Sequence, residues 1–218
     1  MIHDAISLIR KELVVYLAAH GYSPESNADT MVVVENIALF ESNSPANLDD
    51  KIVFTLVNIE EESTLKNVPY QKRNGGNTAR YENPPVYLNL YLLVTSCNKT
   101  AGQNDKNYLD ALERLSHVIR FFQGKNSFSL ANSSSASSSA DVTKFANDDL
   151  VNMSIKAELY TLTFEQINYL WASLGGKQMP FVMYKLRLIA ITDRKLAREV
   201  PLIEEITANS SSTQMPPA

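Results

Sequence analysis

KIVFTLVNIEEE, the stretch at residues 51–62, decides the fold of this chain. Its apolar side chains fall into two alternating sets, which are Ile52, Phe54 and Leu56 on one face and Val53, Thr55 and Val57 on the other. A strand with two largely apolar faces is typical of a sheet that is covered on both sides. We therefore predict a central strand over residues 51–60 that ends in three glutamates.

Four other segments are predicted to be strands: 31–34, with 37–40 as a candidate continuation, 86–95, 151–162 and 181–191. In residues 86–95, alternate leucines from Leu88 to Leu92 form one face, because successive side chains of a strand point to opposite sides. In residues 181–191, Val182, Tyr184, Leu186 and Leu188 form one face, and Lys185 and Arg187 point from the other.

Three segments have the apolar spacing of an amphipathic helix. In residues 2–19 the expected buried stripe is Ile2, Ile6, Ile9, Leu13 and Leu17, and Gly21 can end the helix. In residues 105–123 the expected buried stripe is Tyr108, Leu112, Leu115, Ile119 and Phe122. Residues 164–174 follow Thr163, which can form a capping box with Gln166.

The order of these elements predicts one mixed α+β domain over residues 1–192, with a mainly antiparallel sheet flanked by helices. Residues 64–83, with Asn-Gly-Gly-Asn at 74–77, are expected to form a mobile loop or the tip of an extended hairpin. Residues 125–149 contain the run SSSASSS at 133–139, which predicts a flexible loop. Residues 193–218 are expected to be a C-terminal arm or tail.

Composition and charge exclude several classes of function. The chain has 218 residues, 20 Lys and Arg against 24 Asp and Glu, and a net charge of −4, so it lacks the broad basic field that nucleic-acid binding needs. Its one cysteine, Cys97, excludes an intrachain disulfide and a cysteine zinc cluster. Charged residues interrupt the first twenty positions, and no apolar run is long enough to span a bilayer. We therefore expect the protein to be made, and kept, in the cytoplasm.

No catalytic arrangement is apparent in the sequence. The three histidines lack metal-binding spacing, and the glycine pairs at 75–76 and 175–176 are in the wrong context for phosphate loops. Glu60, Glu61 and Glu62 alternate between the faces of a strand, so they are not expected to converge on one point. Trp171 either packs into the core, which we favour, or serves as a binding hot spot. Lys185 and Arg187 belong either to a solvated face, which we favour, or to ion pairs with the acidic run of a second subunit.

Six segments together resemble one known family, although none is diagnostic by itself. They are Ile2 to Leu17, DKIVFTLVNIEEESTLKN (50–67), PPVYLNLYLL (84–93), YLDALERLSHVIRFFQ (108–123), ELYTLTFEQINYLWASLGG (158–176) and MPFVMYKLRL (179–188). The chain resembles the cap, or tail-terminator, family of extracellular contractile injection systems of the antifeeding-prophage and Photorhabdus virulence-cassette type. The resemblance implies a tail-terminator-like fold and a non-enzymatic hexameric ring. The ring would end the inner tube and anchor the last sheath layer.

The expected partners are other copies of the chain, the inner tube protein and the sheath protein, with no cofactor, nucleic acid or membrane span. We expect residues 64–83 and 193–218 to make these contacts. The candidate interface residues are Glu60, Glu61, Glu62, Arg73, Arg80, Lys185, Arg187, Arg194, Lys195 and Arg198. The alternatives are a non-catalytic adaptor or baseplate-associated module of the same particle. An enzyme ranks third, and it would need a site assembled from Glu60, His117 or Tyr184.

Overall fold

The computed structural model describes residues 2–21, 28–39, 48–65, 71–73, 78–82, 85–98, 105–133, 153–175, 177–191 and 196–201. The chain divides into two compact units. The first consists of residues 1–66 and 86–191, and the second of residues 67–85 and 192–218. The sequence predicted one domain over residues 1–192 with a separate arm. In the second unit, residues 78–82 from that predicted domain pair with residues 196–201 from the predicted arm.

The first unit is built on a six-stranded sheet with the order β1-β2-β5-β8-β7-β6. The strands are β1 (Val32–Val34), β2 (Ile52–Glu61), β5 (Val86–Ser96), β6 (Ser127–Ser129), β7 (Ser154–Leu159) and β8 (Phe181–Ile191). β1 is parallel to β2, and every other pairing is antiparallel. The predicted mixed, mainly antiparallel sheet is therefore confirmed.

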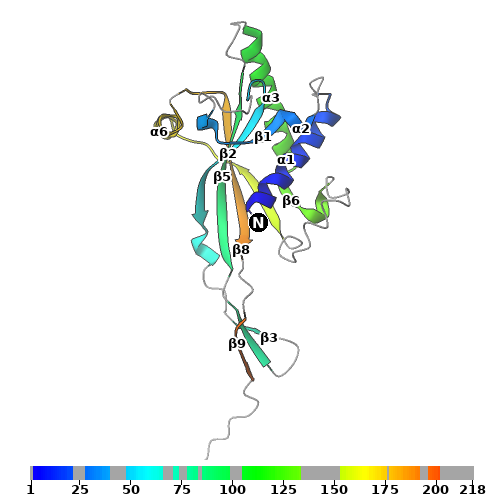
Figure 1. Cartoon of the computed structure of the whole chain (residues 1–218), viewed down its shortest axis with the longest axis vertical. Coiled ribbons are helices and arrows are strands. Elements are labelled where there is room, and N and C mark those ends of the chain that lie inside the picture. Colours follow the sequence, from blue (N-terminus) through cyan, green and yellow to red (C-terminus); the bar gives the residue numbers. More distant parts are fainter. Residues whose placement is uncertain are drawn as a thin grey trace, which may run out of the picture. The chain divides into compact units, whose positions relative to one another are not determined.

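Helices cover both faces of this sheet. α1 (Ile2–Ala19) and α3 (Asp105–Gly124) lie on one side and α6 (Phe164–Ser173) on the other, as Figure 1 shows. Two short helical segments, α2 (Ala28–Met31) and η1 (Ile37–Leu39), lie between α1 and β2 in the chain, and η2 (Ser63–Leu65) follows β2. The double cover explains the sequence of β2, because Phe54 packs toward α1 and α3 while Val53 packs toward α6.

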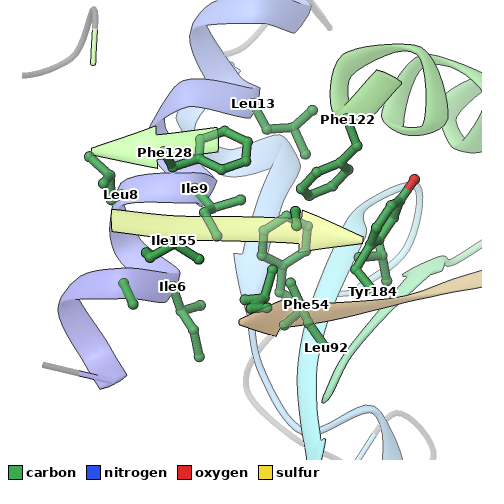
Figure 2. Close-up of a cluster of buried hydrophobic side chains, with 14 of the residues drawn as sticks. Ile6, Leu8, Ile9, Leu13, Phe54, Leu92, Phe122, Phe128, Ile155 and Tyr184 are labelled. Carbon is green, nitrogen blue, oxygen red and sulfur yellow. The ribbon is translucent and has the colours of Figure 1, made fainter. Parts of the chain in front are cut away.

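The larger core lies between the sheet and α1 and α3 (Figure 2). Phe54, Leu92 and Ile155 are fully buried there. The Phe122 ring stacks on Tyr184, with ring centroids 4.0 Å apart. Burial in this cluster raises the pKa of Tyr184 to about 12. Removal of one such ring, as in Phe54→Ala, is expected to cost about 3–5 kcal/mol, because a cavity forms in addition to the lost apolar burial.

The predicted stripe of α1 is confirmed. Its members Ile6, Ile9, Leu13 and Leu17 are buried in the larger core, and Ile2 packs against it. The helix ends where Gly21 takes a φ of +71°, a conformation in which side chains with a Cβ are strained.

The predicted stripe of α3 was partly wrong. The helix buries Ala111, Leu115, Val118, Phe121 and Phe122, whereas Tyr108, Leu112 and Ile119 of the predicted stripe remain 52%, 38% and 44% exposed. Apolar residues occupy more than one side of this helix, so spacing alone could not fix its rotation. Arg114 lies on the buried side of this helix and is only 4% exposed, which the apolar spacing did not predict. Its guanidinium donates hydrogen bonds to Ser96 Oγ at 3.0 Å and to the Cys97 carbonyl at 2.7 Å.

The candidate continuation of the first strand at 37–40 was also wrong, because Ile37–Leu39 forms a 3-10 turn. The Asn36 side chain accepts a hydrogen bond from the Ala38 backbone N–H, which favours a turn over a strand. Thr55 holds the same segment, since its hydroxyl accepts from the Ile37 N–H and donates to the Glu35 carbonyl.

The segment expected to be a flexible loop at 125–149 begins with regular structure. Residues 127–129 form β6, and Leu130–Asn132 forms a 3-10 turn capped by Ser129. A partly buried ion pair holds this region to α1, because Lys125 Nζ lies 2.8 Å from Glu12 Oε2. Most of the serine-rich run lies outside the described residues.

The second unit contains a three-stranded antiparallel sheet with the order β3-β4-β9. β3 (Gln71–Arg73) and β4 (Thr78–Glu82) form the hairpin for which residues 64–83 were one candidate. β9 (Leu196–Pro201) comes from the segment expected to be a C-terminal arm, and it pairs with β4. The hairpin and the C-terminal segment therefore form one structural unit.

Candidate interaction surface

A network of polar side chains crosses three neighbouring strands of the large sheet, β2, β5 and β8. It begins on β2, where the Glu60 carboxylate accepts a hydrogen bond of 2.6 Å from the Tyr91 hydroxyl of β5. Lys185 of β8 lies 3.5 Å from the same carboxylate oxygen. The Lys185 ammonium also lies 5.3 Å from the centroid of the Tyr91 ring, within the range of a cation–π contact.

A second line of contacts runs beside the first. Glu62 accepts a hydrogen bond of 2.9 Å from the Asn89 amide and one of 2.8 Å from the Thr64 hydroxyl. Arg187 lies 3.6 Å from Glu62 and 3.4 Å from Glu158 of β7, so it bridges two carboxylates. We call the six residues Glu60, Glu62, Asn89, Tyr91, Lys185 and Arg187 the cross-strand network.

These contacts favour the charged form of both glutamates. The hydrogen bonds from Asn89 and Thr64 lower the pKa of Glu62 to about 2. The hydrogen bond from Tyr91, and then the charge of Lys185, hold the pKa of Glu60 below its ordinary value. The same hydrogen bond raises the pKa of the Tyr91 phenol. Both carboxylates are therefore ionised at neutral pH, and the network joins β2, β5 and β8 through opposite charges.

A groove with both apolar and polar lining residues lies beside the network, between β2 and α6. One hollow of about 410 Å³ is lined by Ile59, Glu60 and Tyr91 of the sheet and by Leu162, Gln166 and Leu170 of the α6 region. A second hollow, of about 430 Å³, continues past Glu35, Phe54 and Leu174. Val57 and Leu170 line both hollows, so the two are adjacent. We call the two hollows together the β2 groove.

Two carboxylates, Glu35 and Glu60, line the β2 groove, and neither Lys nor Arg is among its described lining residues. Val34 and Ile59 are each 47% exposed beside it. α6 is held over the sheet by Trp171, which is buried and contacts Phe181 edge-on at 5.5 Å. The preferred interpretation of Trp171 as a core residue is therefore confirmed, and so is the capping box between Thr163 and Gln166.

One side of β2 is open along the groove. β1 pairs with β2 only over Ile52–Phe54, and the Glu35 N–H donates to the Phe54 carbonyl at the end of this pairing. No other strand among the described residues pairs with that side of residues 55–61. The Ile59 N–H is satisfied locally by the Asn58 side chain at 2.9 Å. A strand edge with exposed backbone groups is a template for another extended chain.

The candidate interface residues fall into three groups. Glu60, Glu62, Lys185 and Arg187 meet within one chain, which was not foreseen, since their pairing was considered only between subunits. Glu61 points to the opposite face of β2, as expected from strand alternation. The remaining five belong to the second unit, where Arg73, Arg80 and Arg198 lie on β3, β4 and β9, and Arg194 and Lys195 lie outside the described residues.

Sequence reasoning missed Asn89, Tyr91 and Glu158 as members of this surface. Asn89 and Tyr91 had been placed on the face of β5 opposite its leucines, and this is the face that carries Lys185. The signal was therefore available, but it required the strand order β2-β5-β8 to be known. Neighbouring strands contribute cross-strand pairs only once that order is fixed.

The described residues hold little else that could carry chemistry. They contain no group of three His, Cys, Asp or Glu side chains that could bind a metal ion. Cys97 is fully buried, and desolvation raises the pKa of its thiol to about 12. None of the described helices is long and apolar enough to cross a membrane.

A sequence profile of one protein family, the Pvc16 N-terminal domain, matches residues 5–205. The chain belongs to the Pvc16 N-terminal domain family. A search of the curated proteins gave no match. The predicted membership of a contractile-injection-system cap family is confirmed by this assignment together with the solved structures described next.

Two solved structures share the fold of this Pvc16 N-terminal domain. The first is the sheath/tube terminator of an extracellular contractile injection system, PVC, in its extended state. The TM-score is 0.57 at 12% identity, over 96% of this chain and 64% of that one. The second is the tube-terminating cap of the anti-feeding prophage, with a TM-score of 0.52 at 16% identity, over 76% of this chain and 51% of that one. The chain thus spans less than two thirds of either protein, and the expected tail-terminator-like fold is confirmed.

Proposed function

We propose that this Pvc16 N-terminal domain protein is a structural terminator that ends the inner tube of a contractile injection particle. The observation that carries the proposal is the agreement in fold between 96% of the chain and a sheath/tube terminator. The family assignment over residues 5–205 supports it independently of the structural similarity.

A terminator needs one surface that fits the tube and another that offers no site for further growth. We propose that several copies, six by resemblance to the cap family, form a ring through head-to-tail contacts that close by rotation. Each contact between copies should bury about 1,000 Å² or more in total to be stable. The second unit contains five of the ten candidate interface residues, and we propose that it takes part in such contacts.

The proposed role is non-catalytic, and the cross-strand network supports this interpretation. Its carboxylates are held in the charged form by hydrogen bonds and ion pairs inside the sheet. A catalytic acid or base works best with a pKa near the operating pH, whereas Glu62 has a pKa of about 2. The network instead joins β2, β5 and β8 beside the groove through hydrogen bonds and ion pairs, which fixes the arrangement of these side chains.

The partners follow from the position of a terminator in the particle. We propose contacts with the inner tube protein and with the last sheath layer, made in part by residues 64–83 and 193–218. Particles should assemble in the cell before any release. An adaptor or a baseplate-associated module would place the protein at a different point along the particle, and this difference is measurable.

The test is deletion of the protein from cells that make the particle, followed by electron microscopy of the purified particles. We expect tubes of uneven length and sheaths that are lost or not retained, both restored by the full chain. A chain that lacks residues 193–218 should keep the first unit folded but fail to restore sheath attachment. Particles of normal length, yield and contractility after full deletion would refute the proposed function.

A further inference from the structure

The outer side of α3 carries a row of apolar side chains that stay exposed in the described structure. Leu109, Leu112 and Ile119 are 61%, 38% and 44% exposed. Together with the exposed Ser116 they recur at spacings of three and four residues, so the four lie in one row along the helix. The opposite side of α3 is the one that packs into the larger core. The helix therefore has a second apolar row, which faces away from the sheet.

Two opposite charges flank this row on the same side of the helix. Glu113 directly follows Leu112, Arg120 directly follows Ile119, and both charged residues are exposed. About 10 Å of helix separates them, which is too far for an ion pair between the two. Neither has an ion-pair partner within the parts of the chain that the structure describes. The row thus has one unpaired anion and one unpaired cation, on either side of Ser116.

This arrangement is complementary to itself. In an antiparallel pair of α3 helices that cross at Ser116, Leu112 of each copy meets Ile119 of the other. Glu113 of each copy then faces Arg120 of the other, whereas a parallel pair would place like charges together, which is unfavourable. The Ser116 side chain is small, and its hydroxyl donates a hydrogen bond of 2.8 Å to the Leu112 carbonyl of its own helix. The crossing point is therefore free of long side chains.

We propose that two copies of the free chain associate through α3 in this antiparallel arrangement, about a two-fold axis beside Ser116. The helix axes would lie about 8–10 Å apart. A second copy is the partner that the charges select, because one helix supplies both members of the two ion pairs. A contact made by one helix of each copy is smaller than a standard interface of about 1,600 Å², so we expect a weak dimer in exchange with the monomer.

This dimer differs from the ring of the proposed function. A two-fold contact uses the same surface of both copies and is complete with two, so it cannot join copies head-to-tail around a ring. It would instead cover the apolar row of α3 before a copy enters a particle. The dimer is a property of the free chain and does not depend on whether the chain ends a tube.

The first test compares cross-linking at two exposed serines of the full chain. One variant carries Ser116→Cys, at the proposed axis, and the other carries Ser173→Cys, on α6. The two serines are matched, since each is exposed and donates a hydrogen bond to a carbonyl of its own helix, at 2.8 and 2.7 Å. Native Cys97 is buried and the pKa of its thiol is raised to about 12, so it should not react with a short bismaleimide. We expect a several-fold higher dimer yield from Ser116→Cys than from Ser173→Cys.

The second test reverses charges and measures the dimer by sedimentation velocity over a range of concentrations. Glu113→Arg alone and Arg120→Glu alone should each weaken the dimer roughly tenfold, since two attractive pairs become repulsive. The double variant should restore the dimer, and so should an equal mixture of the two single variants. Glu165→Arg, the same charge change at an exposed position of α6, should leave the dimer unchanged.

Equal yields from the two cysteine variants would overturn the proposal, as would single charge reversals that leave the dimer unchanged. A double variant that stays as weak as the single ones, or an α3 that binds tube or sheath protein but not a second copy, would also overturn it. The proposed function is tested separately, by the length and sheath attachment of particles after deletion. Failure of either test therefore leaves the other conclusion standing.

Discussion

The Tyr91 hydroxyl donates a hydrogen bond of 2.6 Å to the Glu60 carboxylate on the neighbouring strand, at the point where the cross-strand network meets the β2 groove. This bond is the largest cause of the lowered pKa of Glu60, and the charge of Lys185 is the next. The phenol ring itself contacts Tyr160 edge-on at 5.0 Å. Tyr91 therefore links the charged part of the surface to its apolar part.

The first prediction concerns the order of these two causes. Tyr91→Phe removes the hydroxyl and keeps the ring, so it should raise the pKa of Glu60 more than Lys185→Met does. The measurement is an NMR titration of the Glu60 side-chain carboxyl carbon in each variant. A larger rise in the Lys185→Met variant would show that charge, and not the hydrogen bond, dominates this site.

The second prediction concerns acid stability. The pKa of Glu62 is about 2 in the folded chain, against an ordinary value of 4.5. A carboxylate with a lowered folded pKa stabilises the fold above its unfolded pKa, and this contribution is lost as the pH falls from about 4.5 toward about 2. Glu62→Gln should therefore flatten the dependence of the melting temperature on pH across this window.

The control for the second prediction is Glu61→Gln, which removes one carboxylate from the opposite face of the same strand. Thermal unfolding of the three proteins at pH 6 and pH 3 gives the comparison. The melting temperature of Glu62→Gln should fall less between pH 6 and pH 3 than that of the unmodified chain. An equal fall would mean that the hydrogen bonds to the ionised Glu62 do not stabilise the fold.

The third prediction tests the rotation of α3. Val118 is fully buried and the adjacent Ile119 is 44% exposed, so the same change at the two positions should differ in cost. Val118→Ser should lower the free energy of unfolding by at least about 2 kcal/mol, because it removes buried methyl groups and buries a hydroxyl. Ile119→Ser should change it by about 0.5 kcal/mol. Urea denaturation measures both losses. A larger loss for Ile119→Ser would mean that Ile119 is buried and Val118 exposed, as the stripe predicted from the sequence required.

The fourth prediction concerns the partly buried ion pair between α1 and Lys125, which directly follows α3. Lys125 lies 2.8 Å from Glu12, whose side chain is 4% exposed. Lys125→Met should lower the free energy of unfolding by about 2 kcal/mol, since it removes a charged hydrogen-bond donor from a carboxylate that is 4% exposed. The double variant Glu12→Leu with Lys125→Met should regain most of that loss. A double variant that is as unstable as the single one would mean that packing, not charge, explains the effect.

Strand and helix positions were predictable here because the hydrophobic patterns were long. β2, β5 and β8 were each expected from alternation, and α1 from its stripe of Ile6, Ile9 and Leu13. The rotation of α3 was not predictable, because its buried side includes Arg114. An arginine is expected on a buried side only when its hydrogen-bond acceptors are known, and here these are Ser96 Oγ and the Cys97 carbonyl. Short elements such as β6 carry too few residues for any pattern to form.

The candidate surface was predictable only in its parts. The sequence favoured a solvated face for Lys185 and Arg187, and their pairing with the acidic run was only an alternative, between subunits. The structure instead pairs them with Glu60 and Glu62 within one chain. That outcome depends on β5 lying between β2 and β8, and strand order is a long-range property. The groove depends on α6 lying over the same face, and its open edge depends on β1 being only three residues long. None of these features can be identified from a short stretch of the sequence alone.

The most direct test of the central claim is to locate the protein in the intact particle. A compact tag would be fused to the N-terminus of the chain, and purified extended particles would be imaged by cryo-electron microscopy with averaging of both ends. The account predicts tag density at the tube end opposite the baseplate, around the last tube and sheath layers. Density along the shaft, at the baseplate, or at neither end of otherwise complete particles would contradict it.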